Sequence, residues 1–336
     1  MTELIKTLTQ IDGISGDENK VREFIIQEIK DYCEYKTDPL RNLLILKKGK
    51  NRASKKLMLD AHMDEVGLII TSITSEGFLK FCTVGGIDTA TLMFKKVRIN
   101  GEISGVISGK PIHLLGKDEA KTLPKTDTLY IDIGANSKDE AEKLVSVGDS
   151  AVVCGGFEQI GDKILSKALD DRIGCAILIK LIKEYENYDF CASFSVQEEL
   201  GLRGAKTAAF SLNPEYALVL EGTTAADISG VSDSETVCNL GEGPAISFMD
   251  RATIYDRDLY NLAINSEVLC QPKRAVAGGN NSGAIHLSRE GIKTLAISVP
   301  CRYIHTNSSV ADLRDCENAY KLAVFMMDKI LSGETK

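Results

Sequence analysis

The stretch Lys56-Leu57-Met58-Leu59-Asp60-Ala61-His62-Met63-Asp64-Glu65-Val66 marks the point at which the character of the chain changes. Its apolar first half is typical of a buried strand, and the strand is followed at once by an imidazole and two carboxylates. On the amino-terminal side, Asn42 to Leu46 is a second apolar run that we also expect to be a strand. From Val66 onward, short β-rich runs replace this pattern, so we expect a domain boundary here.

The region 66–165 has the pattern of a small domain built from strands. Runs rich in apolar and β-branched residues alternate with glycines at Gly67 to Ile73, Phe78 to Val84, Lys96 to Ile99, Glu102 to Ile107 and Thr128 to Ile133. Asn100-Gly101 predicts a hairpin between two of these runs, because both turn positions need a positive φ. With one short helix expected at Lys138 to Val145, the pattern predicts an inserted small β domain, barrel-like or a sandwich.

Residues 1–65 and 166–336 alternate strands with helices instead. This alternation predicts an α/β fold, with a layered mixed, largely parallel sheet flanked by helices. Ser15-Gly16-Asp17-Glu18 has the form of a capping box and predicts the start of one helix. Further strands and helices are expected at Ile173 to Leu181, Ala192 to Val196, Tyr216 to Leu220, Asp258 to Leu269, Thr294 to Val299 and Leu313 to Leu331. We expect both segments to form one catalytic domain.

Composition and charge argue against several classes of protein. A chain of 336 residues with 43% hydrophobic and 26% charged residues is typical of a globular protein with two domains. The net charge is −8 without any block of lysine or arginine, so we do not expect a nucleic-acid partner. Met1 to Lys30 is charged throughout, so we expect neither a signal peptide nor a membrane anchor. Nine cysteines without CxxC spacing favour free thiols in the cytoplasm.

Ionisable residues recur where the expected strands end or the expected helices begin. In α/β sheets, binding sites form beyond the carboxyl ends of the parallel strands. Any one of these acids, taken alone, is better explained by capping a helix or by pairing with a lysine. Together they favour one shared site. The candidate residues are His62, Asp64, Asp170, Glu198, Glu199, Glu221 and His305.

This set of side chains meets the needs of a dinuclear hydrolytic site. Such a site requires nitrogen and oxygen ligands, a carboxylate shared by the two metals and a free carboxylate as base. Asp170 begins a helix, a position from which it could bridge two ions. Glu198 and Glu199 diverge at a strand end, so one could bind metal while the other faces the water. Asp64 could accept the second N–H of His62 and fix its tautomer.

Four motifs in this order resemble those of a known family. They are Ala61-His62-Met63-Asp64-Glu65-Val66-Gly67, Asp170-Asp171-Arg172, Gln197-Glu198-Glu199-Leu200-Gly201 and Arg302-Tyr303-Ile304-His305-Thr306. The chain resembles, over nearly its whole length, the glutamyl and deblocking aminopeptidases, the tetrahedral (TET-type) family of dinuclear metallopeptidases. The resemblance implies a fold like that of zinc aminopeptidases, and removal of N-terminal residues from short peptides. It also implies dimers that assemble into a dodecamer.

The same resemblance assigns roles to the candidate residues. It implies that His62 and Glu221 bind one metal, that Glu199 and His305 bind the other, and that Asp170 bridges them. Glu198 would be the general base, Asp64 would orient His62, and the peptide bond between Asp170 and Asp171 would be cis. Mixed imidazole and carboxylate ligands suit zinc and cobalt and tolerate manganese.

Two positions depart from the family pattern, and some alternatives stay open. Many members have aspartate at the position of Glu221, and Asn281 lies in a glycine-rich segment where the family usually has an aspartate. Asp227 is an alternative ligand, while Arg251 and Arg302 could meet substrate carboxylates or form salt bridges. The rival functions are a glycoside hydrolase, which the absence of tryptophan disfavours, a related dinuclear amidohydrolase or carboxypeptidase, and a non-catalytic binding module.

Overall fold

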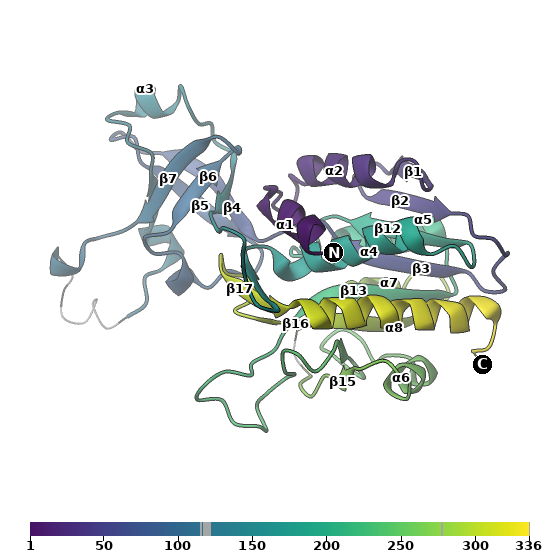
Figure 1. Cartoon of the computed structure of the whole chain (residues 1–336). Coiled ribbons are helices and arrows are strands. Elements are labelled where there is room, and N and C mark those ends of the chain that lie inside the picture. Colours follow the sequence, from purple (N-terminus) through teal and green to yellow (C-terminus); the bar gives the residue numbers. More distant parts are fainter. Residues whose placement is uncertain (115, 117–121, 277, 336) are drawn as a thin grey trace.

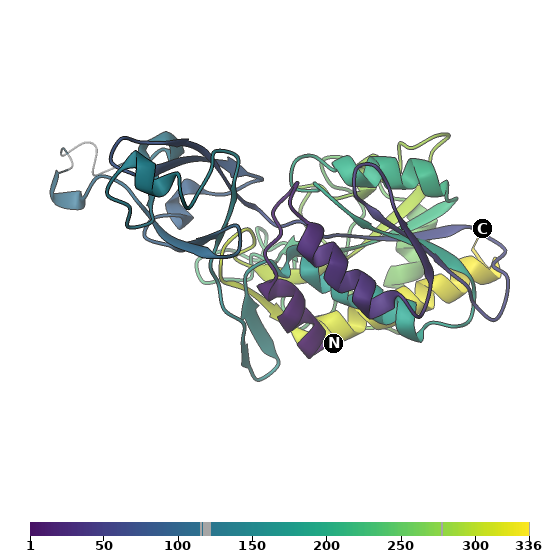
Figure 2. The same cartoon turned by 90° about the horizontal axis from the view of Figure 1, so that it is seen from above.

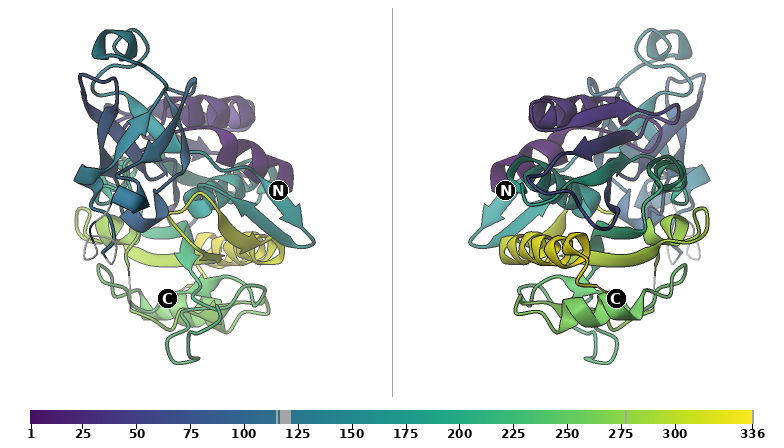
Figure 3. Two further views of the ribbon diagram at one scale, coloured as in Figure 1. Left: turned by 90° about the vertical axis from the view of Figure 1, so that its left-hand side faces the viewer. Right: turned by 90° about the vertical axis from the view of Figure 1, so that its right-hand side faces the viewer.

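A large mixed sheet covered by helices makes up most of the molecule, and a separate barrel projects from one end of it (Figures 1 and 2). The computed structural model describes residues 1–114, 116, 122–276 and 278–335. The end views in Figure 3 show the barrel and the amino-terminal helices in the upper half of the molecule, with the green segment that includes α6 at the bottom. The carboxyl terminus lies at the end of the molecule opposite the barrel (Figure 1). The predicted fold class, a mixed α/β sheet with an inserted barrel-like domain, is confirmed.

The large sheet has a parallel centre and antiparallel edges. Within the described residues its main path runs β1-β2-β12-β3-β13-β16-β17-β11-β10, with β14 and β15 added beside β16. The parallel centre consists of β12, β3, β13 and β16. The bounds are β1 Glu34–Thr37, β2 Leu43–Lys47, β3 Leu57–His62, β10 Glu158–Ile160, β11 Lys163–Ser166, β12 Phe190–Ser195, β13 Tyr216–Thr224, β14 Ala245–Ile246, β15 Gln271–Pro272, β16 Lys293–Arg302 and β17 Ser309–Asp312.

Helices cover both faces of this sheet. On one face α1, α2 and α8 pack around α4, whereas α5 and α7 lie together on the other face (Figure 2). The apolar stripe of α4, which includes Ile173, Ile177 and Leu181, is fully buried in the core. The bounds are α1 Thr2–Gln10, α2 Asn19–Ile29, α4 Leu169–Glu184, α5 Arg203–Leu212, α6 Arg257–Ile264, α7 Ser282–Ile285 and α8 Leu313–Ser332.

The inserted region forms a closed barrel with the strand order β4-β5-β8-β7-β6-β9. The predicted hairpin is confirmed: Asn100 and Gly101 have φ values of 52° and 81°, and Ile99 pairs with Ile103. The bounds are β4 Gly67–Ile73, β5 Leu79–Val84, β6 Lys96–Ile99, β7 Ile103–Ser108, β8 Tyr130–Asp132 and β9 Ser150–Val153, with α3 Lys138–Ala141 and 3₁₀ turns at Thr89–Thr91, Ile112–Leu114 and Thr126–Thr128.

The strand pairing bears on where the inserted domain ends. The barrel strands run from Gly67 to Val153, whereas β10 and β11 pair with β17 of the large sheet. We therefore propose that the inserted domain ends near Val153 rather than at residue 165, and that the rest of the chain forms the catalytic domain.

Several local predictions differ from the structure. The capping box is wrong: α2 begins at Asn19 without a side-chain cap, because the Ser15 hydroxyl donates instead to the buried carboxylate of Asp64 at 2.6 Å. Strand β13 continues beyond Leu220, because it pairs with β16 as far as Cys301. Helices α1 and α5 were not predicted, and α6 ends before residue 269.

The helices and the cysteines bear on the predicted absence of a membrane anchor and on the predicted free thiols. Across the described residues, no helix combines the length and the apolar character needed to cross a bilayer. All nine cysteines are free, and five of them are buried.

Candidate active site

The sequence-predicted site residues converge at the carboxyl ends of the central strands, on the side of the sheet nearest the barrel (Figure 1). His62 is the last residue of β3, and Glu198 and Glu199 follow β12. Glu221 lies within β13, and His305 follows β16. Asp170 lies in the first turn of α4, and its peptide bond to Asp171 is cis. Because the four strands are parallel, their ends meet, and these side chains come together.

The carboxylate of Asp170 lies between two imidazoles. Its Oδ1 is 3.3 Å from Nε2 of His62, and its Oδ2 is 3.4 Å from Nε2 of His305. Glu221 Oε1 approaches the same nitrogen of His62 at 3.3 Å. Glu199 Oε1 approaches the same nitrogen of His305, also at 3.3 Å. The five side chains therefore form two adjoining groups that share Asp170.

The separations within these two groups fit a metal site better than a hydrogen-bonded cluster. Ordinary N–H···O bonds are shorter, at roughly 2.7–3.2 Å. Neighbouring ligands in a tetrahedral shell with metal–ligand bonds of about 2.0–2.2 Å would lie about 3.3–3.6 Å apart. His62 Nε2, Asp170 Oδ1 and Glu221 Oε2 are buried and have no hydrogen-bond partner among the described residues. The donor set and these orphaned atoms both fit divalent cations.

The electrostatics of the cluster lead to the same conclusion. Burial, together with the neighbouring carboxylates, raises the pKa of Glu198 and of Glu221 well above the usual range. Burial and the nearby Asp170 raise the pKa of Glu199 to about 7. Burial opposes an imidazolium at His305, but Asp170 and Glu199 outweigh it and raise its pKa to about 9. The cluster thus holds more carboxylates than its two imidazoles can balance, and bound cations would relieve this repulsion.

Asp64 supports the site from beneath. Its carboxylate accepts hydrogen bonds from the backbone N–H of Glu198 at 3.0 Å and of Glu199 at 3.1 Å. It also lies 3.4 Å from Nδ1 of His62, whose nearest acceptor is the carbonyl oxygen of Asp64 at 3.1 Å. Asp64 therefore positions both the imidazole and the two glutamates.

Three supporting contacts were not predicted from the sequence. Asp171 lies close enough to His62 and Glu221 to be a third metal ligand beside them. Its carboxylate is already engaged, however, because it accepts hydrogen bonds from the backbone N–H groups of His62 and Gly174. Glu18 accepts the backbone N–H of Gln197. The sequence could have indicated a supporting role for Asp171, because it directly follows the candidate ligand Asp170. Nothing in the local sequence indicates such a role for Glu18, which only the tertiary fold brings to the site.

The barrel contributes directly to the position of one imidazole. His305 Nδ1 faces the carbonyl oxygen of Gly86 at 2.9 Å, and Gly86 lies just after β5 of the barrel. On the opposite side of the site, Gly222 leaves room for Asp170, since a Cβ at residue 222 would lie 3.1 Å from the Cβ of Asp170. Glycines at positions 86 and 222 thus allow the backbone on both sides of the site to come close to His305 and Asp170.

The remaining candidate residues lie outside the two groups. Asp227 forms a two-bond ion pair with Arg302, so both side chains are already engaged with each other. Asn281 is buried and donates to Asp60 and Ser195, so it belongs to the packing beneath β3 and β12.

A cavity of about 590 Å³ opens over the cluster. Asp170, Glu198, Glu199, Glu221 and His305 form its floor. Its walls come from the end of β13, with Thr223 and Thr224, and from loops between β13 and β16, with Val237, Arg251, Lys273 and Asn280.

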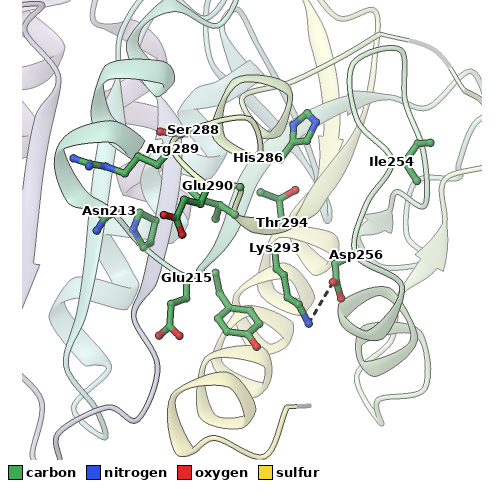
Figure 4. A pocket seen from close by; sticks show the side chains of 14 residues that line it. Asn213, Glu215, Ile254, Asp256, His286, Ser288, Arg289, Glu290, Lys293 and Thr294 are labelled. Carbon is green, nitrogen blue, oxygen red and sulfur yellow. Dashed lines mark ion pairs between the residues drawn. The ribbon is translucent and has the colours of Figure 1, made fainter.

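A second cavity of about 790 Å³ lies at the opposite ends of β13 and β16 (Figure 4). Its lining includes His286 and an ion pair between Lys293 and Asp256 at 3.6 Å. Within the part of the chain that the structure describes, neither group of potential metal ligands includes a residue from this cavity. The chemistry therefore concentrates in the first cavity.

Comparison with known proteins identifies the family. Residues 41–322 match the model of the M42 glutamyl aminopeptidase family. The chain belongs to this family. It is 41% identical to a putative aminopeptidase of Acetivibrio thermocellus over 332 residues, covering 96% of this chain and 97% of that protein. It is 30% identical to the lysyl aminopeptidase of Pyrococcus furiosus over 346 residues, covering 98% and 97% of the two chains.

Solved structures of TET peptidases have the same fold. The TET aminopeptidase of the marine sediment archaeon Thaumarchaeota archaeon SCGC AB-539-E09 superposes with a TM-score of 0.94 at 35% identity, covering 98% of this chain and 96% of that one. The Pyrococcus horikoshii TET1 peptidase, which can assemble into a tetrahedron or a large octahedral shell, gives 0.85 at 36% identity, covering 97% and 98%.

These comparisons confirm that this M42 chain is an aminopeptidase, a hydrolase that acts on peptide bonds. The family and both relatives named above are aminopeptidases, which favours a peptidase over a glycoside hydrolase. One similar solved structure, from Thermotoga maritima, is nevertheless named an endoglucanase; it gives a TM-score of 0.81 at 34% identity, covering 97% of this chain and 98% of that one.

Proposed function

We propose that this M42 aminopeptidase is a dinuclear metalloenzyme that removes N-terminal residues from short peptides. His62 and Glu221 would hold one cation, Glu199 and His305 the other, and Asp170 would bridge the two. The observation that carries this proposal is the carboxylate of Asp170, whose two oxygens approach two different imidazoles at 3.3 and 3.4 Å. A carboxylate that bridges two metals through both of its oxygens would present them in this way.

Glu198 is the group best placed to act as general base. Its carboxylate lines the cavity, and one oxygen lies 4.0 Å from Nε2 of His62. When bound, the cations supply an acidified water and polarise the scissile carbonyl. Glu198 accepts the proton of that water and returns it to the leaving amine. Asp64 holds the backbone of Glu198 and thereby keeps its carboxylate in place.

Metal content and turnover, measured on the same samples, test these roles. Glu198→Gln should retain two metals per subunit, measured by mass spectrometry, and lose roughly 10²- to 10⁴-fold in kcat. Asp170→Asn should lose metal together with activity. Glu317→Gln, which changes a glutamate on α8 away from the site, serves as the control. Near-normal turnover by Glu198→Gln would remove Glu198 as the base.

A related dinuclear amidohydrolase or carboxypeptidase is distinguished by the end of the peptide that it requires. The proposed enzyme should cleave peptides with a free amino terminus and leave their N-acetylated counterparts intact. Equal cleavage of the two would favour the alternative.

The metal itself is expected to be zinc or cobalt, with manganese tolerated, because the proposed ligands combine imidazole and carboxylate groups. Reloading the apoprotein with each ion in turn and measuring turnover ranks them.

We further propose a homo-oligomer, dimers assembling into a dodecamer, in the cytoplasm. The assembly of the Pyrococcus horikoshii TET1 peptidase supports the oligomer. So do apolar barrel side chains such as Phe94, which is 70% exposed in the single chain. The nine free cysteines are in keeping with a reducing compartment. Light scattering would give the mass of the assembly, and a monomer would contradict the proposal.

A further inference from the structure

A second hollow in the surface adjoins the active-site cavity. It is a groove of about 1000 Å³ between α5, the segment from α7 to Arg289, and the loop that joins β1 to β2. Gly201 and Leu202 line this groove and also line the cavity over the candidate ligands. Both residues follow Glu199 closely in the chain. The groove therefore begins beside the proposed catalytic centre.

Most of the groove is apolar, and two of its side chains are strongly exposed. Leu287 is 73% exposed and Phe210 is 58% exposed, while Leu40 and Ala284 complete the apolar lining. Apolar side chains that gather in an exposed hollow mark a surface that binds a ligand or a partner. The guanidinium of Arg289 lies 4.0 Å from the centre of the Phe210 ring and donates two hydrogen bonds to the carbonyl oxygen of that residue. This contact holds Phe210 in place.

Lys206 brings a positive charge to the same groove. Leu202, Lys206 and Phe210 follow one another at intervals of four residues, so they lie along one side of α5. Lys206 is exposed, and its ammonium group makes no hydrogen bond or ion pair with any residue that the structure describes. The acid in the lining, Asp38, is already engaged by the backbone and side-chain N–H groups of Asn42. Lys206 is thus available to a carboxylate of a ligand.

The spacing of these residues along α5 suits an extended peptide. A helix rises about 1.5 Å per residue, so Lys206 lies about 6 Å beyond Leu202 and Phe210 about 12 Å beyond it. An extended peptide advances about 3.3–3.6 Å per residue. A tripeptide whose second residue lies against Leu202 would therefore end near Lys206.

We propose that this groove binds the second and third residues of the peptide substrate and prefers apolar side chains there, with Lys206 pairing with the terminal carboxylate of tripeptides. The inference rests on the proposed function and extends it to the part of the substrate beyond the scissile bond. Because the groove shares Gly201 and Leu202 with the active-site cavity, its position favours a substrate as the occupant over a second copy of the chain.

Leucyl substrates that differ only beyond the first residue test the groove on the metal-loaded enzyme. We expect kcat/KM for Leu-Phe-Leu to exceed that for Leu-Gly-Gly by about tenfold, because two apolar side chains are removed from water. Leu287→Ser should remove most of this advantage through KM and leave the leucyl p-nitroanilide, which has no second residue, unaffected. Ile160→Ser changes an apolar side chain on β10 that is 64% exposed and outside the groove, so it is the matched control.

The terminal carboxylate is tested separately. Lys206→Gln should raise KM for Leu-Phe-Leu by about two- to fivefold and leave KM for its C-terminal amide unchanged, because an exposed ion pair contributes modestly. Lys321→Gln, which changes an exposed lysine of α8, is the control.

Calorimetry provides a readout that does not depend on turnover. The probe is a Leu-Phe-Leu analogue whose first peptide bond is reduced to CH2–NH, so that the enzyme cannot hydrolyse it. Its affinity for the metal-loaded enzyme should fall in Leu287→Ser and in Lys206→Gln, and should not change in the two controls.

The outcomes separate the two proposals. Absence of hydrolysis of every leucyl substrate would sink the proposed function and this inference with it. Equal hydrolysis of the two tripeptides, or unchanged binding of the analogue by Leu287→Ser, would overturn the inference alone. An equal effect of Lys206→Gln on the acid and the amide would overturn the role of Lys206. A smaller assembly of Leu287→Ser in light scattering would also overturn the inference, because a second copy of the chain would then cover the groove.

Discussion

At the scale of single residues, Asp64 connects separate parts of the site through one carboxylate. It holds the N–H groups of Glu198 and Glu199 and accepts the hydroxyl of Ser15. Groups that orient metal ligands in this way typically contribute a factor of about 10 to 100 in metal affinity. Since Asp64 is fully buried, water cannot replace its contacts.

Asp64→Asn should therefore weaken metal binding by about 10- to 100-fold, because the amide has one acceptor oxygen instead of two. Competition with a chelating dye measures the affinity. Ser15→Ala, which removes only one of the contacts, should have a smaller effect, and the exposed Asp31→Asn should have none. An unchanged affinity in Asp64→Asn would show that the backbone around Glu198 holds its shape without this carboxylate.

At the scale of elements, an ion pair joins the barrel to the segment between α1 and α2. Arg98 of β6 makes two hydrogen bonds to Asp12, at 2.5 and 2.6 Å, in the segment between α1 and α2. Burial acts to raise the pKa of Asp12, but Arg98 and Lys167 outweigh it and hold that pKa below the ordinary value. The charged carboxylate is therefore the form that stabilises the junction.

Asp12→Asn should lower the unfolding free energy at pH 7. A depressed folded pKa means that the contribution is present above the unfolded pKa, about 3.9, and is lost as the pH falls through the lower folded value. The difference between wild type and variant should thus shrink below about pH 4. Denaturant midpoints at pH 7 and at pH 3 measure it, with Asp31→Asn as the control. A difference that does not depend on pH would mean that the side chain acts by packing.

Local pattern was sufficient for some elements and insufficient for others. Asn100-Gly101 predicts its hairpin because the required φ values are a property of those two residues. The capping box at Ser15 failed because a buried acid 49 residues away competes for the same hydroxyl. No local rule contains that competitor.

In the candidate site too, some residues could be predicted from local sequence and others could not. His62 and Asp170 could be found because parallel strands must end at a common edge and because their motifs resemble those of the family. Glu18 and Arg251 could not be placed, since they reach the site from loops whose course depends on tertiary contacts.

At the scale of the whole molecule, the proposed cations would fasten together segments that are remote in sequence, from β3 to the residues after β16. Because a folded site binds them and an unfolded chain does not, a free concentration of 100 times Kd adds about 2.7 kcal/mol of stability.

Chelation should consequently lower the melting temperature, and adding the metal back should restore it. Scanning calorimetry measures the shift, and Asp170→Asn should show almost none. If the wild-type melting temperature did not respond to chelator, cations could not be part of the folded structure.

The contact between Gly86 and His305 ties the behaviour of the barrel to the chemistry. Any movement of the barrel away from the sheet would pull on that imidazole, and in the proposed dinuclear site it would weaken the bond between His305 and its cation. If His305 binds a cation as proposed, a peptide large enough to displace the barrel would also disturb the metal site, and we expect it to be hydrolysed slowly.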